Sequence, residues 1–446
     1  MNRRSAFFKS AVLRWITLLA LGLLLSAMLG ACSPGHTGGN EIAFLRGGNL
    51  WEIDQDGSNL HQVATNQILG FSWSPDHQQI VLRMSNGKTP ADALPYGYPD
   101  LTSELGVTSV DGGNIIQITP PNSGLWRSDA WWDASGNRLL YREEKSGTDG
   151  QLETPHWELS QSDQPAGIAR KDLPASAVLP AVNSDGSQIA SIDASGRVLV
   201  GAPGSPATVI ATGAVTMLPG TPGYPARPLW QPNTGSLLYA FASAGPTPDV
   251  TTLVLRNSSG KVQPLVTAAN IQQYAWSPDG RELLVRTASE YQLYSASGAE
   301  RFSWSDANAI SLPFWSPDSR VLLILEPDNA TLVNVVTQQR QQLLSGTITL
   351  PTPFADAHLA PFLRPATSSP WNSDSSAVLL SNDGQGTWAT QPDTPLPTGK
   401  GGGSGLYLVT LAQPNSVPQF PTLVDWGDHQ SIAWTTLDPN CAFLIV

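Results

Sequence analysis

The sequence feature that most constrains the fold is a short turn motif that recurs along the chain. In its clearest copy, Trp276 is followed by Ser-Pro-Asp-Gly and then by the apolar run 283–285. The proline presets φ for a tight turn, the aspartate can hydrogen-bond to nearby backbone, and Gly280 can adopt a positive φ. Each copy therefore predicts an aromatic anchor, a tight turn and a β-strand.

The anchor position occurs eight times, at a mean spacing of about 50 residues. Seven anchors are tryptophans, and Val182 replaces the eighth: the tryptophans are Trp73, Trp132, Trp230, Trp276, Trp315, Trp371 and Trp434. Two further strands are predicted between copies, for example at 291–294 and 300–304. Four short strands per repeat, at this spacing, indicate the blades of a β-propeller in an all-β chain. A solenoid is the alternative, although solenoid repeats are usually shorter and more regular.

The two ends of the repeat array suggest how a ring would close. The strand predicted at 41–45 follows no turn motif, whereas the Trp434 copy leads into a final apolar run at 441–446. We expect the last and first strands to share one blade, because this removes free sheet edges. Residues 41–446 would then form one propeller domain of eight blades, or of seven if the Val182 copy is degenerate.

A family resemblance supports this interpretation. The W-S-P-D-G turns and the stretch Asn49–Asn59 (N-L-W-E-I-D-Q-D-G-S-N) resemble the WD40-like repeats of TolB-type propellers. The resemblance covers essentially all of 41–446, with about four of the eight turns as close matches. It implies the fold and says little about function, because one fold supports many functions. TolB has an α/β domain before its propeller, and here only about ten residues separate Cys32 from the first predicted strand.

Residues 1–31 have the composition of a bacterial signal peptide. Four basic residues precede an apolar run at 15–29, which is shorter than the roughly 20 residues that span a membrane. The run ends in Leu29-Gly30-Ala31-Cys32, which resembles the lipobox of bacterial lipoproteins. An ordinary cleaved signal peptide with a chance cysteine is the alternative.

The lipobox resemblance implies cleavage before Cys32 and a diacylglycerol attached to its sulfur. Two or three acyl chains would anchor the protein stably, because each buried CH₂ contributes about 0.8 kcal/mol. Residues 32–40 would form a flexible tether between the lipid and the propeller. We therefore expect an extracytoplasmic protein on the outer face of the cell membrane or on the periplasmic side of a membrane.

Charge and cysteine content limit the partners and the cross-links. Without the four basic residues of the leader, 20 basic and 36 acidic residues remain, a net charge of about −16. An acidic chain argues against binding of nucleic acid or anionic lipid, which requires clustered Lys and Arg. The two cysteines are Cys32 and Cys441, so a lipidated Cys32 leaves Cys441 as a buried small hydrophobe without a disulfide partner.

Two acidic stretches could be metal sites, and each has a simpler interpretation. Residues 54–59 (D-Q-D-G-S-N) could be a calcium loop, but the distal bidentate glutamate is missing. The cluster of Asp425, Asp428 and His429 is incomplete for zinc. We interpret both stretches as turns and predict no metal and no cofactor.

Two further stretches suggest catalysis only weakly. Residues 381–388 (S-N-D-G-Q-G-T-W) resemble the Asp-box of sialidase-type propellers, but Gln385 departs from it and the box occurs once. Residues 402–405 form a glycine-rich stretch and not the nucleophile elbow of a hydrolase. We therefore predict that the protein is not an enzyme.

Aromatic residues in or beside longer connections are the remaining candidates for binding. They are Tyr96, Tyr98, Trp126, Trp157 and Trp388. Four connections exceed the length of a blade turn, at 85–106, 216–228, 351–370 and 390–405, and long loops often carry function. Exposed aromatics suit sugar stacking or protein binding, whereas packing between blades is the simpler role.

These observations predict a monomeric interaction platform. The propeller would bind an envelope or secreted protein through loops on one face of the ring. The alternative is a polysaccharide-binding or carbohydrate-active propeller, for which exposed Trp or Tyr beside paired carboxylates would be diagnostic.

Overall fold

The computed structural model divides the chain into two compact units, one of residues 1–39 with 437–446 and one of residues 40–436. The structure describes residues of the second unit, namely 41–434 apart from 66, 75–77, 86–101, 111, 122–123, 128–129, 133–135, 145–155, 162–170, 173–175, 177, 179, 185–186, 203, 219–225, 243–249, 306–311, 347–369, 373, 383–386, 389–390, 397–403, 412–420 and 427–429. The predicted signal peptide 1–31, Cys32, the predicted tether 32–40 and Cys441 lie outside these residues. Within them, no helix is long and apolar enough to cross a membrane.

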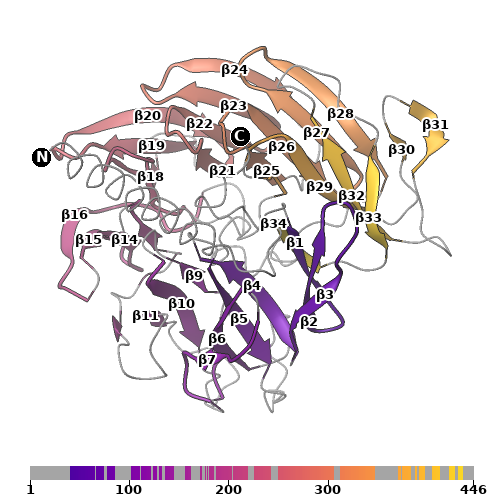
Figure 1. Cartoon of the computed structure of the whole chain (residues 1–446). Coiled ribbons are helices and arrows are strands. Elements are labelled where there is room, and N and C mark those ends of the chain that lie inside the picture. The colour runs from indigo at the N-terminus through magenta and orange to yellow at the C-terminus, as the bar shows by residue number, and fades with distance from the viewer. Residues whose placement is uncertain are drawn as a thin grey trace, which may run out of the picture. The chain divides into compact units, whose positions relative to one another are not determined.

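The described strands form eight antiparallel sheets, numbered here in chain order (Figure 1). Sheet 1 contains β1 (Glu41–Arg46), β2 (Asn49–Asp54), β3 (His61–Ala64) and β34 (Gln430–Trp434). Sheet 2 contains β4 (Ile68–Trp73), β5 (Gln79–Ser85), β6 (Ser103–Ser109) and β7 (Ile116–Gln117). Sheet 3 contains β8 (Trp126–Arg127), β9 (Trp131–Trp132), β10 (Arg138–Glu144), β11 (His156–Gln161) and β12 (Lys171–Asp172). Sheet 4 contains β13 (Ala181–Val182), β14 (Ile189–Ile192), β15 (Val198–Gly201) and β16 (Thr208–Ala211).

The second half of the chain forms the other four sheets. Sheet 5 contains β17 (Leu229–Trp230), β18 (Leu237–Ala242), β19 (Val250–Arg256) and β20 (Val262–Ala269). Sheet 6 contains β21 (Ile271–Trp276), β22 (Glu282–Thr287), β23 (Glu290–Ser295) and β24 (Glu300–Ser305). Sheet 7 contains β25 (Leu312–Trp315), β26 (Val321–Glu326), β27 (Asn329–Asn334), β28 (Gln339–Ser345), β30 (Thr387–Trp388) and β31 (Gln391–Pro395). Sheet 8 contains β29 (Ala377–Asn382), β32 (Gly405–Thr410) and β33 (Thr422–Trp426).

The predicted all-β class is confirmed, and the four-stranded repeat is confirmed for five of the eight described sheets, whereas sheets 3, 7 and 8 have five, six and three strands. In sheet 3, the short strands β8 and β9 both pair with β10. In sheet 8, the segment between β29 and β32 forms the hairpin of β30 and β31, which pairs with β28 at the edge of sheet 7. The expectation that 390–405 is a loop throughout is therefore wrong, because 391–395 form β31, and the predicted loop 85–106 ends earlier, because β6 begins at Ser103.

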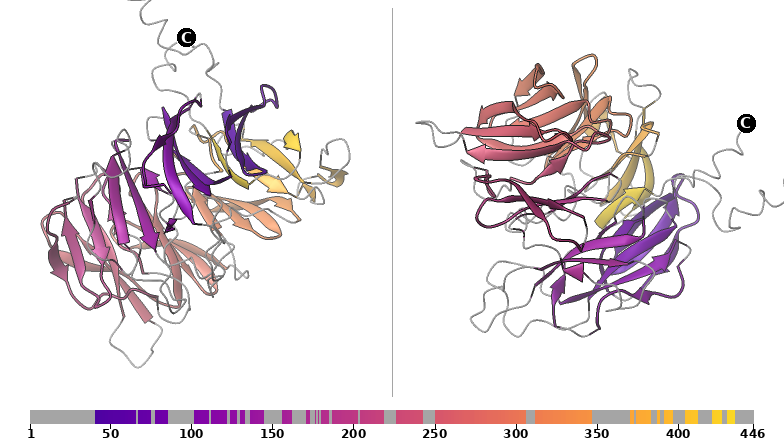
Figure 2. Two further views of the ribbon diagram at one scale, coloured as in Figure 1. Left: turned by 90° about the horizontal axis from the view of Figure 1, so that it is seen from below. Right: turned by 90° about the vertical axis from the view of Figure 1, so that its left-hand side faces the viewer.

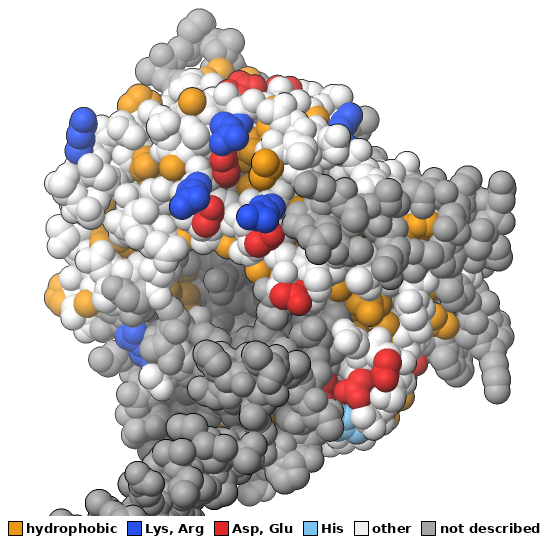
Figure 3. Space-filling view, turned by 45° about the horizontal axis from the view of Figure 1, so that its top comes forward, with side chains coloured by type: hydrophobic (Ala, Val, Ile, Leu, Met, Phe, Trp, Pro, Cys, Tyr) orange, Lys and Arg blue, Asp and Glu red, His pale blue; other side chains and the backbone are white. Residues whose placement is uncertain are grey.

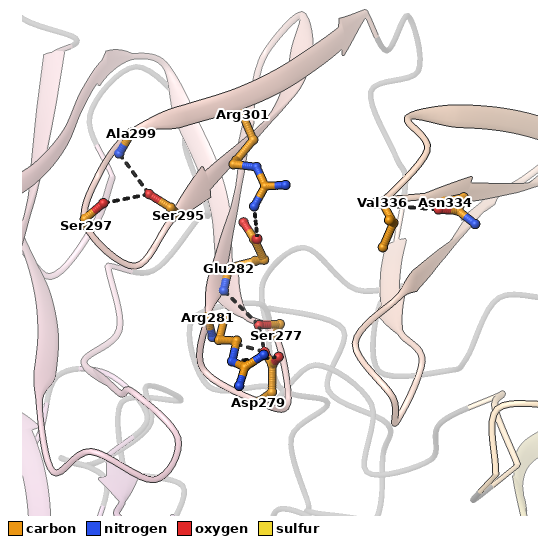
Figure 4. A network of polar contacts seen from close by, with 10 residues as sticks. All are labelled: Ser277, Asp279, Arg281, Glu282, Ser295, Ser297, Ala299, Arg301, Asn334 and Val336. Carbon is orange, nitrogen blue, oxygen red and sulfur yellow. Dashed lines mark hydrogen bonds and ion pairs between the residues drawn. The ribbon is translucent and has the colours of Figure 1, made fainter.

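The turn motif folds through its own side chains, as sheet 6 shows (Figure 4). Ser277 Oγ accepts a hydrogen bond from the amide of Glu282 (3.0 Å) and donates one to Asp279 Oδ1 (2.7 Å). The same Asp279 oxygen accepts from the amide of Arg281 (3.0 Å). Gly280 has a φ of 71°, as predicted, and a Cβ there would lie 2.7 Å from the carbonyl oxygen of Pro232 in sheet 5. A side chain is thus excluded by backbone conformation and by the neighbouring sheet.

The same bonds recur in other copies. Ser316 Oγ accepts from the amide of Val321 (2.9 Å) and donates to Asp318 Oδ1 (2.6 Å), and Asn372 Oδ1 accepts from the amide of Ala377 (2.9 Å). Neighbouring turns are also joined, because Ser319 Oγ accepts from the amide of Asp279 (3.1 Å) in sheet 6. Ser319 and Ser375 take the place of Gly280 at φ values of 62° and 64°. Serine is thus tolerated at the position that glycine occupies in the Trp276 copy.

Neighbouring sheets pack face to face and share apolar cores. Clusters of buried side chains join sheets 1 and 2, 2 and 3, 4 and 5, 5 and 6, 6 and 7, and 7 and 8, and a further cluster joins sheet 8 to sheet 1. The tryptophan anchors contribute to these contacts. The indole N–H groups of Trp132, Trp230 and Trp371 donate to the carbonyl oxygens of Ser72, Ala181 and Phe314 (3.1, 3.0 and 3.0 Å). Each acceptor directly precedes an earlier anchor position, so the anchors connect one repeat to another.

The first and last strands share a sheet, as the sequence predicts. β34 pairs antiparallel with β1, with Ile42 opposite Trp434 and Ala43 opposite Ala433. β1 thus takes the place of the strand that follows the anchor in other copies, and the apolar run 441–446 lies outside the described residues. The views in Figure 2 agree with this arrangement, because the indigo first strands lie beside the yellow last ones. The fold of this unit is propeller-like.

Candidate functional site at the loop face

The order of strands gives each sheet two different ends. In an antiparallel sheet of four consecutive strands, the first turn and the third turn lie at one end, which we name the turn face. The turn between the second and third strands and the connection to the next sheet lie at the other end, which we name the loop face. In sheet 6, the motif turn 277–280 is on the turn face and the connection Ala288–Ser289 is on the loop face.

Three of the long connections predicted from the sequence, 85–106, 216–228 and 351–370, are flanked by strand ends at the loop face, and 390–405 lies within a longer segment whose ends are also there. The connection after Ser85 joins the second and third strands of sheet 2, and the one from 390 to 405 belongs to the corresponding connection in sheet 8. The connection 216–228 leads from sheet 4 to sheet 5, and 351–370 leads from sheet 7 to sheet 8. Sequence length alone could not assign them to one face, because the assignment requires the direction of each strand.

The two faces also differ in exposed charge. On the turn face, the exposed charged or titratable residues of the described chain are Asp56, His61, Lys261, Asp279, Arg281, Glu300, Arg301, Asp318, Arg320, Arg340 and Asp374. On the described connections of the loop face they are Arg197 and Asp328. Basic and acidic side chains lie next to one another on the face drawn in Figure 3, and Arg301 Nη1 contacts Glu282 Oε1 at 2.7 Å. Among the residues that the structure describes, the loop-face connections thus carry fewer exposed charged side chains than the turn face.

Charged side chains near the loop face are instead buried. Arg127 is fully buried in sheet 3, and its Nε donates to Glu143 Oε1 at 2.7 Å. The Arg127 amide also donates to Ser103 Oγ of sheet 2 at 3.0 Å, so this pair connects two sheets. Arg286 is 1% exposed and lies over the ring of Tyr291, with 5.7 Å between the guanidinium carbon and the ring centroid. Buried charges of this kind require such partners, because desolvation is otherwise very unfavourable.

Several polar atoms near the loop face are buried without a hydrogen-bond partner. Thr251 Oγ1 and Ser381 Oγ belong to side chains that are 0% and 3% exposed, and Gln272 Oε1 and Asn329 Oδ1 are also unpaired. Most buried polar atoms in proteins are paired, and buried polar atoms without a partner also lie toward the turn face, among them Thr108 Oγ1 and Glu282 Oε2. An ordered water or a bound group could satisfy them.

The structure changes the interpretation of one candidate aromatic. Trp388 is 1% exposed and lies in the core shared by sheets 7 and 8, so it is not an exposed binding aromatic. Trp126 lies in β8 and Trp157 lies in β11, and their side chains are outside the description. Tyr96 and Tyr98 fall outside the described residues.

The stretch 54–59 is a turn between β2 and β3, as predicted. Its carboxylates are used within the turn, because Ser58 Oγ donates to Asp54 Oδ2 (3.1 Å) and the Ser58 amide donates to Asp56 Oδ1 (2.9 Å). The hydrogen bonds from Ser58 lower the pKa of Asp56. The turn thus satisfies the oxygens that a calcium ion would require.

The second acidic stretch is only partly described. Asp425 lies in β33 and forms an ion pair with Arg46 of β1 (2.6 Å), whereas Asp428 and His429 lie outside the described residues. This pair joins sheet 8 to sheet 1 at the loop face. Within the part of the chain that the structure describes, no three His, Cys, Asp or Glu residues are placed to hold a metal ion.

Sequence analysis did not select the aromatic cluster of sheet 6. Trp304 stacks with Tyr291 (centroids 5.1 Å apart) and with Phe302 (5.2 Å), and all three pack in the core between sheets 6 and 7. The signal was the spacing of Phe302 and Trp304, which places both rings on one side of a strand. Both rings are partly buried, so the cluster supports packing between sheets.

Comparison with known proteins supports the fold and not a function. No protein-family model matches the chain, and no curated protein matches its sequence. A crystal structure described as that of the eukaryotic initiation factor is similar over 89% of this chain and 98% of its own, with a TM-score of 0.51 and 10% identity. Porphyromonas gingivalis dipeptidyl peptidase 4 is similar over 66% of this chain and 49% of its own, with a TM-score of 0.45 and 11% identity. A functionally unknown protein from Desulfotomaculum acetoxidans is similar over 68% of this chain and 94% of its own, with a TM-score of 0.40 and 11% identity. At such low identity, the first likeness indicates a shared fold alone.

Proposed function

We propose that this chain is a bacterial lipoprotein, anchored to a membrane outside the cytoplasm through Cys32, whose propeller binds another protein. The propeller would have eight TolB-like blades and would act as an interaction platform without catalysing a reaction. Its partner would be an envelope or secreted protein that contacts the loop face.

The observation that carries this proposal is the concentration of long connections on the loop face. The predicted connections 85–106, 216–228 and 351–370 are flanked by strand ends on that face, and the segment between β29 and β32, which includes 390–405, also begins and ends there. Long loops on a rigid scaffold are a common location of binding residues. The low exposed charge of the described loop-face connections supports the same assignment, because interface cores are depleted in charged residues.

The test is affinity purification of the lipidated full chain from crosslinked native membranes, with partners identified by mass spectrometry. A loop-face variant would carry Met217→Glu, Ser289→Arg and Asp328→Arg, which change three exposed residues on different sheet connections. A matched turn-face variant would carry Arg281→Glu, Arg320→Glu and Asp374→Arg. We expect one stoichiometric partner that is lost from the loop-face variant and retained by the turn-face variant.

Two outcomes would contradict the proposal. Loss of the partner only from the turn-face variant would show that the binding surface lies on the turn face and not on the loop face. Absence of any partner above background, together with binding in a polysaccharide screen, would favour the carbohydrate-binding alternative.

A further inference from the structure

His61 of sheet 1 contacts the turn 54–60, and this turn lies against sheet 8. His61 begins β3, directly after the turn 54–60. Its Nε2 lies 3.4 Å from Glu52 Oε2, and its Nδ1 lies 2.9 Å from the carbonyl oxygen of Asn59. A carboxylate and a carbonyl oxygen are both acceptors, so both contacts are favourable together only when both ring nitrogens carry protons. The contacts therefore favour the imidazolium form of His61.

Glu52 makes this charge structurally important. Its side chain is 0% exposed, whereas that of His61 is 51% exposed. Neither carboxylate oxygen of Glu52 accepts a hydrogen bond in the described part of the chain. The ion pair with His61 is therefore the described interaction that offsets the burial of its negative charge. An isolated buried carboxylate is strongly unfavourable in a protein interior. Loss of the His61 proton would leave Glu52 in that state.

The described side chains that face the pair of His61 and Glu52 are acidic or neutral, and none of them is basic. Glu41 of β1 is 6% exposed and lies on the same side of the sheet as Glu52, because Glu52 is opposite Ala43. From sheet 2, Thr108 is 3% exposed and its Oγ1 has no partner, and Glu104 faces sheet 1 at the other end of β6. The carboxylate of Asp54 accepts from Ser58 within the turn. The Glu52 carboxylate, which pairs with the charged imidazole, together with the Asn59 carbonyl and the negative charge of Glu41, raises the pKa of His61 to about 9 in spite of partial burial.

The turn that His61 clamps touches sheet 8. Gly57, at a φ of 82°, lies so close to β33 that a Cβ on it would be 2.6 Å from the carbonyl oxygen of Val424. Asn59, whose carbonyl accepts from His61, has a φ of 54°, in the left-handed region that few residues other than glycine adopt. The contacts of His61 thus hold a turn of unusual conformation against the sheet that neighbours sheet 1 across the ring closure.

We propose that His61 and Glu52 form a protonation-dependent latch that holds the turn 54–60 against sheet 8. With His61 charged, the turn stays ordered and the contact of Gly57 with Val424 is kept. Deprotonation of His61 in alkaline solution removes the positive charge that pairs with Glu52, and it leaves one ring nitrogen without a proton to donate. The turn is then released from sheet 8. The latch acts on the sheet in which the first and last strands of the ring meet.

The test combines two measurements on the full chain. NMR would follow the titration of the imidazole of His61, assigned by its absence in His61→Arg, and we expect a midpoint near 9 that falls toward about 6.5 in Glu52→Gln. Hydrogen exchange at pH 7 and pH 10, corrected for the intrinsic pH dependence, would follow peptides that cover 54–61 and 421–426. We expect about fivefold faster exchange at pH 10 in the wild type.

Matched variants separate the latch from general alkaline loosening. His61→Arg keeps a positive charge at pH 10, so its exchange in these peptides should not change between the two pH values. In His61→Gln, the amides of these peptides should exchange fast at both pH 7 and pH 10. A titration of His61 near 6.5 in the wild type, or equal alkaline acceleration in the wild type and His61→Arg, would overturn the proposal. Both of these outcomes can be measured even if His61→Gln fails to fold.

Discussion

The turn face and the loop face are ends of the same strands, yet they are stabilised in different ways. On the turn face, short-range bonds within each motif repeat from sheet to sheet, as in Ser277 with Asp279 and Ser316 with Asp318. Near the loop face, contacts are irregular and long-range, as in Arg127 with Glu143 and Arg46 with Asp425. A repeated local motif thus specifies the scaffold, and the opposite ends of the strands are left to vary.

The largest expected effect concerns the anchor of the repeated motif. Trp276 is 8% exposed and packs in the core between sheets 5 and 6. We expect Trp276→Ala to lower the free energy of unfolding by about 3–5 kcal/mol, because it leaves a large cavity. Its Nε1 has no hydrogen-bond partner, so Trp276→Phe should lower the free energy much less. Chemical denaturation measures both, and equal effects of the two substitutions would show that packing is not its main role.

A comparable effect is expected for the buried ion pair near the loop face. Arg127→Ala removes the ion-pair partner of the buried Glu143 carboxylate, so we expect a loss of about 3–5 kcal/mol in the free energy of unfolding. The double variant Arg127→Met, Glu143→Leu removes both charges and should recover most of that loss. Urea denaturation of both variants is the measurement. A double variant as unstable as Arg127→Ala would mean that packing of Arg127 is more important than its charge.

A smaller effect is expected from a single added methyl group on the turn face. Gly280→Ala forces a side chain into a positive φ and toward the carbonyl oxygen of Pro232. We expect a loss of about 1–3 kcal/mol in the free energy of unfolding. As a control, Gly124→Ala places a Cβ in open space at a φ of 70°, so it tests the backbone contribution alone. Equal losses in thermal denaturation would exclude a contribution from the contact with sheet 5.

The smallest expected effect is a pH dependence from His61. Its pKa rises from 6.5 to about 9 on folding, so its contribution to stability is complete below pH 6.5 and is lost as the pH rises through 9. Because the side chain is half exposed, we expect a loss of about 1 kcal/mol across this range. The measurement is the difference in unfolding free energy between wild type and His61→Gln from pH 6 to pH 10. A difference that does not shrink with rising pH would contradict the assignment.

Much of the scaffold could be predicted from the sequence because the information is local. The residues that fold each turn lie within the motif itself, which is why the strands after Trp276 and Trp315 were located correctly. Closure through β1 was also predictable, because it follows from the unpaired first strand. The crossing of β30 and β31 to sheet 7 was not, since it depends on a contact between Trp388 and Leu344 that no local pattern contains.

The candidate site was less predictable for a related reason. Loop lengths can be counted in a sequence, but the face on which a loop lies depends on strand order and direction. The pairing of Glu52 with His61 likewise depends on register between β2 and β3. The face of each loop and the contact of Glu52 with His61 can therefore be assigned only once the pairing of the strands is known.

The pairing of β34 with β1 has a consequence for the time course of synthesis. The ribosome makes β1 near the beginning of the domain and β34 at its end, so sheet 1 lacks one strand until nearly the whole domain exists. At typical elongation rates this interval is on the order of tens of seconds. During it, one edge of the apolar strand β1 is available to other chains. A nascent chain of this type would therefore benefit from a chaperone that covers this edge until the final strand arrives.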